Sequence, residues 1–387
     1  MPLANSFTSG VAAPDHEFSC PLSVSYCPQC HLVQLTHVVP PEKMFSHYLY
    51  VSSTSNSFQQ HFRDYSEAVC GWFKESTLGL AVDIGSNDGA LVKSFMQRGV
   101  PAIGVDPATN LSNEANSRRI PTINRFFDEE CVDTIMRQYG PAGVVTANNV
   151  FAHVDDTPTF CQNVCRLLRK DGLFIIEFPY LLTMCQKTLF DMIYHEHLSY
   201  LSVSAVQYIL NKHQFEILAI DEVTSHGGSL RLIAQKAGGP RNSNGAWREH
   251  LVREQQQGYQ NENTYAEFSA RVHSIRVQLQ AFVTDYRAQG RTIAGYGAPA
   301  KANTLINFCK WSQNDFVYIV DDNPLKQGLN APGSGIPVRS SREMIDDAPD
   351  AVMVFAWNFA DEIIRKMRPL LKDSVQWVIP LPKPAFV

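Results

Sequence analysis

The stretch VDIGSNDGALVKSFMQRGVPAIGVDPA, residues 82–108, decides the fold class. It begins in an apolar run that ends at Gly85, continues through a helix-length segment, and reaches a second apolar run that ends at Asp106. Two more buried-strand runs, GVVTANNV and GLFIIEFP, follow with helix-length segments between them. Apolar strands that alternate with helices are typical of a parallel sheet covered on both faces. We therefore predict an α/β domain with a doubly wound parallel sheet.

Glycines and an acidic residue mark the first turn of this sheet. Gly85 and Gly89 directly follow the strand, which lets the backbone approach a ligand at the N-terminus of the next helix. Asp106 follows after about twenty residues, where a carboxylate can accept two ribose hydroxyls. The spacing is DxGxxxG rather than GxGxxG, so it favours S-adenosylmethionine over a dinucleotide. The alternative is an ordinary strand-to-helix turn that carries the same residue types.

Polar residues at the tips of two strands extend this predicted cofactor site. Asp83 precedes the first glycine, Asn87 and Asp88 lie inside the turn, and Asn148 and Asn149 close the GVVTANNV strand. The carboxyl ends of parallel strands meet at one edge of a sheet, so we expect these side chains to face the same ligand.

The sequence pattern changes twice along the chain, which predicts three parts. Residues 1–66 are Pro-rich and irregular, with the strand-like run HLVQLTHVV, and form a small N-terminal module. Residues 67–240 form the Rossmann-like domain. Residues 241–387 begin as a helical connector and continue through the strand-like runs TIAGYG, FVYIVDD, AVMVFAW and VQWVIPLP. These runs predict a second, smaller Rossmann-like domain.

Composition narrows the class of partner. The 387 residues include 33 basic and 38 acidic ones, for a net charge of −5, which gives no field for gathering nucleic acid or an anionic membrane. No window approaches the length of a membrane helix, and the N-terminus lacks the pattern of a signal peptide. The nine cysteines are spread along the chain, as expected for reduced thiols. We expect a cytoplasmic enzyme with a small-molecule substrate, and no motif indicates an oligomeric state.

Four separated motifs identify a family. They are FDMIYHEHLSY (residues 190–200), SHGGSLR (225–231), GYGAPAKANTLINFC (295–309) and VDDNPLKQGLNAPGSGIPV (320–338). In this order they resemble the deoxysugar C-methyltransferases, especially the TDP-sugar C3-methyltransferases, and the likeness runs from PLANSF to AWNFADEI. The resemblance implies a zinc-binding N-terminal module, a central methyl-donor domain and a Rossmann-like C-terminal domain. It also implies S-adenosylmethionine-dependent methylation at carbon 3 of a TDP-linked 4-keto sugar.

The resemblance assigns roles to five side chains. Deprotonation beside a ketone needs a base within reach and a donor that steadies the enolate oxygen. The family match implies that His197 is the base and that Tyr194 and Glu196 accompany it. It further implies that Tyr48 donates to the intermediate and that His153 holds the C4 oxygen. For each residue alone, packing or capping is the competing interpretation.

The YHEHLSY segment also has a geometry that the sequence predicts. HEHLS is not HExxH, so no zinc protease site is indicated. In an extended segment, side chains alternate, so His195 and His197 would share one face while Tyr194 and Glu196 share the other. A tight turn would alter this arrangement.

The zinc module of the family uses two CxxC pairs, whereas this chain has only CPQC, with Cys27 and Cys30. A tetrahedral structural zinc requires four ligands. Cys20 with His31 or His37 could complete a site. We favour instead two thiols in a turn, without metal.

The turn GYGAPAK, residues 295–301, resembles a nucleotide-binding turn, and Asp321 stands where a ribose-binding acid would stand. The family resemblance implies that this domain binds no second cofactor and helps to form the substrate cleft. Lys301, Lys326 and Arg231 are candidates to bind the diphosphate, and ordinary salt bridges are the alternative for each.

Two other functions compete with the sugar methyltransferase. The same fold and base could methylate a non-sugar keto acid or β-dicarbonyl compound. A non-catalytic protein that binds S-adenosylmethionine is the second alternative, and the presence of Tyr48, His153, Glu196 and His197 argues against it.

Overall fold

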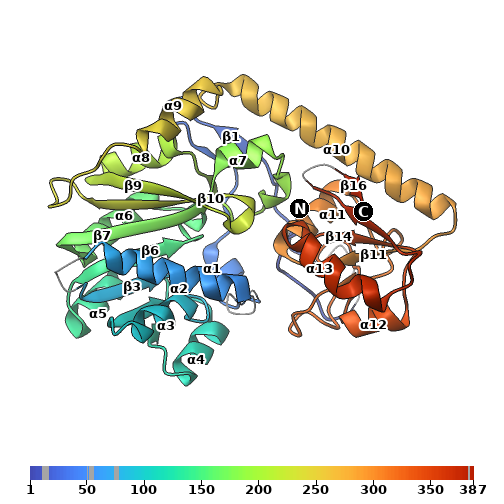
Figure 1. The fold of residues 1–387 in the computed structure, drawn as a ribbon, viewed down its shortest axis with the longest axis horizontal. Coiled ribbons are helices and arrows are strands. Elements are labelled where there is room, and N and C mark those ends of the chain that lie inside the picture. The colour runs from blue at the N-terminus through green and yellow to red at the C-terminus, as the bar shows by residue number, and fades with distance from the viewer. Residues whose placement is uncertain (11–16, 50, 52–55, 74–77, 382–383) are drawn as a thin grey trace.

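The computed structural model describes residues 1–10, 17–49, 51, 56–73, 78–381 and 384–387. Two lobes, each built on its own sheet, are bridged along one side by a long helix (Figure 1). In the described residues no helix combines the length and apolar character needed to cross a bilayer.

The larger lobe contains a seven-stranded sheet in the order β5-β4-β3-β6-β7-β10-β9. The predicted strands lie at its centre, and their residues are almost all buried because helices cover both faces (Figure 1). The strands are β3 (Leu80–Ile84), β4 (Ala102–Val105), β5 (Thr122–Ile123), β6 (Ala142–Asn148), β7 (Leu168–Pro179), β9 (Phe215–Val223) and β10 (Ser229–Lys236).

The prediction of a wholly parallel sheet is wrong for β10. This strand pairs antiparallel with both β7 and β9. Only a short turn around the 3₁₀ helix η5 (Ser225–Gly227) joins β9 to β10, and a parallel connection needs a crossover of a dozen or more residues.

Helices on the two faces of the sheet complete this lobe. They are α2 (Asn56–Gly71), α3 (Ala90–Gln97), α4 (Thr109–Ser117), α5 (Glu129–Gln138), α6 (Thr157–Leu167), α7 (Leu181–Gln186) and α8 (Val203–Lys212), with the 3₁₀ helices η3 (Phe151–His153) and η4 (Phe190–Met192).

Helix α2 corrects the predicted boundary at residues 66/67, which falls inside it. Tyr65 and Val69 are buried in one apolar cluster with Leu91 and Phe95 of α3. Helix α2 therefore belongs to the larger lobe. The prediction failed because its polar residues dominate the sequence, whereas the buried stripe becomes evident only against α3.

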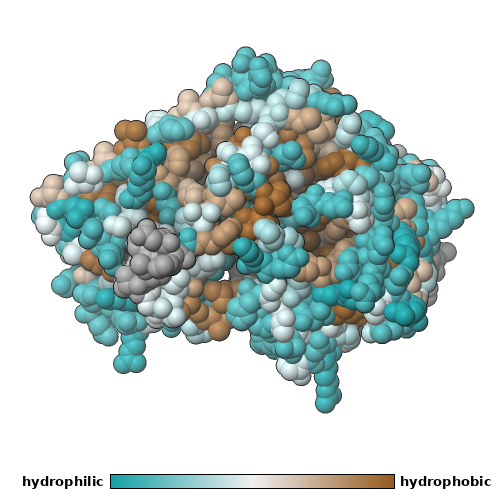
Figure 2. Space-filling view, turned by 180° about the vertical axis from the view of Figure 1, so that it is seen from behind, coloured by the Kyte–Doolittle hydropathy of each residue, from teal (hydrophilic) through white to brown (hydrophobic). Residues whose placement is uncertain are grey.

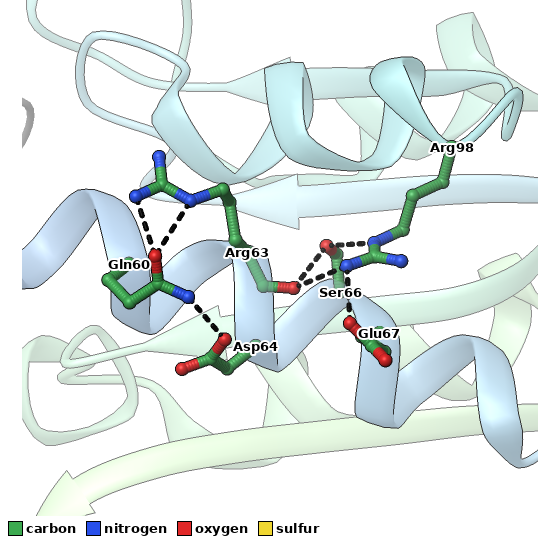
Figure 3. A network of polar contacts seen from close by, with 6 residues as sticks. All are labelled: Gln60, Arg63, Asp64, Ser66, Glu67 and Arg98. Atoms are coloured by element: carbon green, nitrogen blue, oxygen red, sulfur yellow. Dashed lines mark hydrogen bonds and ion pairs between the residues drawn. The ribbon is translucent and has the colours of Figure 1, made fainter.

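Arg98, just after α3, also attaches the outer face of α2 (Figure 3). Its Nε donates to Ser66 Oγ at 2.9 Å, and its Nη2 donates to Glu67 Oε2 at 2.9 Å and to the Arg63 carbonyl at 3.0 Å. Exposed pairs of this kind contribute little stability, so burial of the apolar stripe is the main attachment.

The N-terminal module is small and pairs through one strand with the larger lobe. It contains β1 (Val24–Tyr26), β2 (Val33–Leu35) and α1 (Pro41–Phe45), and β2 corresponds to the predicted HLVQLTHVV strand. Its sheet has the order β1-β2-β8, and β8 (Ser199–Tyr200) directly follows the YHEH motif. The module therefore shares a sheet with the segment that carries the predicted base.

The connector and the second lobe follow the predicted order. Helices α9 (Arg248–Gln256) and α10 (Glu262–Ala288) lead to a sheet of order β13-β12-β11-β14-β15-β16, which is parallel except for β16. The remaining elements are β11 (Ile293–Tyr296), α11 (Ala300–Cys309), β12 (Ile319–Val320), β13 (Val338–Arg339), α12 (Ser341–Asp346), β14 (Ala351–Val354), η6 (Trp357–Phe359), α13 (Ala360–Met367), η7 (Arg368–Leu370), β15 (Gln376–Ile379) and β16 (Ala385–Phe386). This is the second Rossmann-like domain.

The lobes meet through apolar side chains, and further hydrophobic residues are visible near the middle of the face drawn in Figure 2. Phe190 of η4 packs with the core of the second lobe, and its ring centroid lies 5.2 Å from that of Phe308 in α11. The YHEH motif begins only a few residues after Phe190, so this contact brings the motif to the junction of the lobes.

Candidate active site

The YHEH segment forms a turn rather than a strand. The amide of His197 donates to the carbonyl of Tyr194 at 2.9 Å. The alternation expected for an extended segment is therefore wrong: His195 points to the Cys20 carbonyl, with Nε2 3.1 Å from that oxygen, whereas His197 faces Tyr194. The turn separates the two histidines because a hydrogen bond across three residues reverses the chain.

The contacts of His197 determine its tautomer. Nδ1 lies 2.7 Å from the Met192 carbonyl oxygen, which can only accept, so Nδ1 carries the proton. Nε2 is then the acceptor, and it lies 2.9 Å from the Tyr194 hydroxyl. A neutral imidazole with its Nε2 lone pair directed at a donor is suited to accept a proton.

Glu196 is held by the N-terminal segments. Its side chain is 4% exposed, and its two oxygens accept from the Tyr48 hydroxyl and from Asn5 Nδ2, each at 2.6 Å. Burial raises the pKa of Glu196, while these two hydrogen bonds and the charge of Lys326 oppose the increase.

A row of aromatic rings connects the Tyr194–His197 pair with the Tyr48–Glu196 pair. The Phe45 ring centroid lies 5.9 Å from that of Tyr48 and 5.5 Å from that of His153. The His153 ring lies 5.1 Å from that of His197. The structure therefore brings together all five side chains to which the resemblance assigns catalytic roles, from both the N-terminal module and the larger lobe.

The glycine turn lies beside this row. Gly85 has φ +65°, and a Cβ on it would meet Val150 Cγ2 at 2.3 Å, so no other residue fits without a shift. Gly89 has φ +79°, and a Cβ on it would meet Ile120 Cγ2 at 2.6 Å. Val150 immediately precedes η3, which carries His153, so Val150 links the glycine turn to the row of rings.

Two aspartates frame the turn. Asp106 accepts from the Asn87 amide at 2.7 Å and from the Ala108 amide at 2.8 Å, and burial raises its pKa to about 6. Asp83 accepts from the Thr146 hydroxyl at 2.6 Å, and burial raises its pKa to about 7. Each oxygen of Asp106 keeps a second lone pair that a ribose hydroxyl can use.

Buried polar atoms around the turn fit S-adenosylmethionine. Within the described chain, neither carboxylate oxygen of Asp88 has a hydrogen-bond partner, and neither does Asn149 Oδ1. Arg118 approaches Asp88 only to 3.9 Å. Asn148 lies beside Asp83, whose pKa it lowers. Buried polar groups normally have partners, so these acceptors suit the amino group and ribose of the methyl donor.

Arg231 forms a buried salt bridge with Glu177 of β7. Its Nη2 lies 3.0 Å from Glu177 Oε2, both side chains are buried, and its guanidinium stacks on Tyr65. Glu177 also lies 3.0 Å from His61. Arg231 thus adopts the salt-bridge alternative to diphosphate binding, and sequence reasoning missed Glu177 because it lies inside an apolar strand.

Lys301 faces the lobe junction beside a carboxylate that the sequence did not single out. Asp191 is 1% exposed and accepts from Trp357 Nε1 at 2.6 Å. Lys301 lies 4.4 Å above the Trp357 ring and donates to Asn358. Burial lowers the pKa of Lys301 to about 8, and burial raises that of Asp191 to about 6, each opposed by the other charge.

Lys326 is enclosed next to the second glycine turn. Its side chain is 5% exposed, and Nζ donates to the Ala298 carbonyl at 2.8 Å and lies 4.0 Å from Asp321. Asp321 accepts from the Ala298 amide at 2.7 Å. The acid at the predicted ribose position is thus bonded to the turn itself.

The CPQC turn, as far as the structure describes its surroundings, is not part of a larger group of metal ligands. The described residues contain no group of three or more His, Cys, Asp or Glu side chains that could hold a metal ion. His31 bonds to the Tyr26 hydroxyl at 2.7 Å. Backbone amides, that of Cys30 first, lower the pKa of the Cys27 thiol. Two thiols do not fit a tetrahedral zinc site.

The sequence matches known families in three segments. Residues 1–45 match a putative zinc binding domain, residues 72–220 a methyltransferase domain, and residues 224–382 a C-methyltransferase C-terminal domain. The solved structures that resemble the chain include magnesium protoporphyrin IX methyltransferase from Synechocystis PCC 6803 (16% identity, 46% of this chain and 79% of that one, TM-score 0.34). A SAM-dependent methyltransferase from Archaeoglobus fulgidus is another (13% identity, 46% and 94%, TM-score 0.38).

A curated relative covers the whole chain. The C-methyltransferase NovU of Streptomyces niveus is 35% identical over 386 residues, which span 100% of this chain and 92% of the relative. This likeness includes both lobes and the N-terminal module, at whose junction the row of rings described above lies. From these matches, together with the glycine turn and its buried acceptors, the chain belongs to the C-methyltransferase family.

Proposed function

We propose that this enzyme removes a proton from a carbon beside a ketone and methylates that carbon, and that its substrate is a TDP-linked 4-keto-deoxysugar methylated at C3. The observation that carries the proposal is the tautomer of His197. A backbone carbonyl holds the proton on Nδ1, so Nε2 carries the lone pair that accepts the substrate proton.

The other residues of the row have supporting roles in this proposal. In the resting site the Tyr194 hydroxyl bonds to His197 Nε2. This hydrogen bond breaks when the substrate binds, so that Nε2 can take the proton from the substrate carbon. His153 donates to the C4 oxygen as that oxygen gains charge. Glu196 orients the Tyr48 hydroxyl, which donates a hydrogen bond to the enolate intermediate.

The donor is held by the Gly85 turn, Asp106 and the acceptors of Asp88 and Asn149. S-adenosylmethionine supplies, when bound, a methyl group that is already activated for attack by a carbon nucleophile. The protein's contribution is to orient the substrate carbon and to exclude water, and both effects come from positioning.

The substrate assignment draws on the name of the relative and on the motif resemblance. Lys301 at the lobe junction can contribute a positive charge to a diphosphate. A keto-acid substrate would need no nucleotide contact. Binding of thymidine diphosphate, measured by calorimetry, therefore distinguishes the two substrate classes, and its absence alongside tight donor binding would favour the non-sugar substrate.

Replacement of the base tests the chemistry. We expect His197→Gln to lower the rate of methyl transfer by about 10²- to 10³-fold, because a general base contributes on that scale. His195→Gln is the matched control, since His195 Nε2 lies 3.1 Å from the Cys20 carbonyl oxygen and not beside Tyr194. Mass spectrometry of the product and deuterium uptake at C3 measure the effect. Full activity of the His197 variant would refute the assignment.

A further inference from the structure

Glu196 depends on groups outside its own domain. The Tyr48 hydroxyl reaches one of its oxygens from the N-terminal module, and Asn5 Nδ2 reaches the other from the first residues of the chain. Both distances are 2.6 Å, short enough for charge-assisted hydrogen bonds. Asn5 thus bonds to the carboxylate as closely as the proposed catalytic tyrosine does.

The second lobe anchors the segment that carries Asn5. The Thr8 amide donates to the Asn330 carbonyl at 3.1 Å, and the Asn330 amide donates back to Thr8 at 2.8 Å. On the other side of Asn5, Asn303 Nδ2 of α11 donates to the Ala4 carbonyl at 2.6 Å. Asn5 therefore lies between two anchors on the second lobe, while its side chain reaches a carboxylate of the larger lobe.

Lys326 of the second lobe lies against the N-terminal segment that carries Asn5. Its Nζ lies 5.2 Å from the ring centroid of Phe7, and its charge acts on Glu196. Burial lowers the pKa of Lys326, and the charges of Asp321 and Glu196 oppose this. Tyr48 and Lys326 act on Glu196 as titratable groups, so Asn5 is the donor among its three polar neighbours that does not titrate.

We propose that Asn5 is a positioning residue of the active site, which fixes the Glu196 carboxylate so that its second oxygen accepts the Tyr48 hydroxyl. The second lobe thereby completes the site through the N-terminal segment. This inference rests on the proposed function of Glu196 and Tyr48. It extends that function by making the geometry of the carboxylate depend on contact between the lobes.

The test compares two changes at Asn5 with one at its anchor. Asn5→Ala removes the donor, and Asn5→Asp keeps the shape but replaces the donor with a second carboxylate. Asn330→Ala is the matched control, because the Asn330 side chain bonds to the Gly10 carbonyl at 2.8 Å and has no bond to Glu196. Thermal melts compare the folded stability of all four proteins.

The first measurement needs no substrate. A ¹³C NMR titration of the full-length protein, labelled at the glutamate side-chain carboxyl and assigned with Glu196→Gln, follows the ionisation of Glu196. We expect Asn5→Ala to raise the midpoint by about one pH unit, a tenfold change in proton affinity. Asn5→Asp should raise it further because like charges disfavour ionisation. Asn330→Ala should leave it unchanged.

The second measurement is the pH profile of methyl transfer. The acid limb of kcat should move upward by the same amount in the Asn5 variants, with the donor KM unchanged. The proposal is overturned if the midpoint does not move, if Asn330→Ala moves it equally, or if it moves without any change in kcat. Failure of the wild type to methylate TDP-sugars would refute the proposed substrate but would leave the NMR result readable. Should Asn5→Ala not fold, the nearly isosteric Asn5→Asp decides.

Discussion

Each lobe contains a glycine turn of the same local geometry, but the two turns have different surroundings. Each turn follows an inner strand of its sheet, β3 or β11, and contains a glycine with positive φ, +65° at Gly85 and +88° at Gly297. In each, an aspartate at the end of the next strand accepts from a turn amide at 2.7 Å: Asp106 from Asn87, and Asp321 from Ala298. Local backbone chemistry is therefore shared.

The difference lies in what surrounds each turn. Around Gly85, buried acceptors of Asp88 and Asn149 have no hydrogen-bond partner among the described residues. At Gly297, Lys326 donates to the turn carbonyl and lies 4.0 Å from Asp321. The first turn is built to receive a ligand, whereas the second is satisfied by the protein itself. A glycine turn with an acid after it therefore indicates a nucleotide-type site only when its polar groups lack internal partners.

Alanine substitutions at Gly85 and Gly297 should give the largest difference in donor binding between the two turns. Both changes add backbone strain at positive φ. We expect Gly85→Ala to weaken S-adenosylmethionine binding on the order of a hundredfold, because its Cβ would displace Val150 at the cofactor site. Gly297→Ala, whose Cβ would meet Ala356, should lower the melting temperature without changing donor affinity. Calorimetric titration and thermal melts measure both, and equal losses of donor affinity would contradict the comparison.

Substitutions of Asp106 and Asp321 should give a smaller difference in donor affinity than the glycine substitutions. Asp106→Asn should weaken donor binding roughly tenfold, because a neutral amide holds the ribose hydroxyls less strongly than a carboxylate does. Asp321→Asn should leave donor binding unchanged and loosen the turn around Ala298. Titration calorimetry at neutral pH measures the difference. If Asp321→Asn weakened donor binding as much, the second turn would also be a donor site.

The smallest expected effect is a dependence of donor affinity on pH. Burial raises the pKa of Asp106 to about 6, so the carboxylate gains a proton as the pH falls through this value and loses its charge as an acceptor. Affinity should fall about twofold between pH 7.5 and pH 6, because half of the groups are protonated at the pKa. Asp106→Asn should remove this component, leaving only that of Asp83, whose pKa burial raises to about 7. An unaltered pH profile in Asp106→Asn would contradict the assignment.

Sequence reasoning was most successful where a pattern is local. Apolar runs in alternation with helices predicted the positions of the central strands in both lobes, because burial on both faces requires such runs. It failed where partners are distant in the sequence. The boundary at 66/67 cut through α2, the YHEH segment was a turn, and Arg231 paired with Glu177, which lies inside an apolar strand. Asn5 stood within the matching PLANSF motif without any sign of its chemistry.

The amino-acid sequence by itself determined the two α/β lobes, the glycine turn for the methyl donor and the family, because each depends on spacing within a short segment. Only the tertiary structure decided which nitrogen of His197 holds its proton, which turn is already filled, and that Asn5 reaches Glu196. These features depend on contacts between segments up to 191 residues apart. A hydrogen bond depends on distance and direction in space, which the order of residues along the chain does not specify.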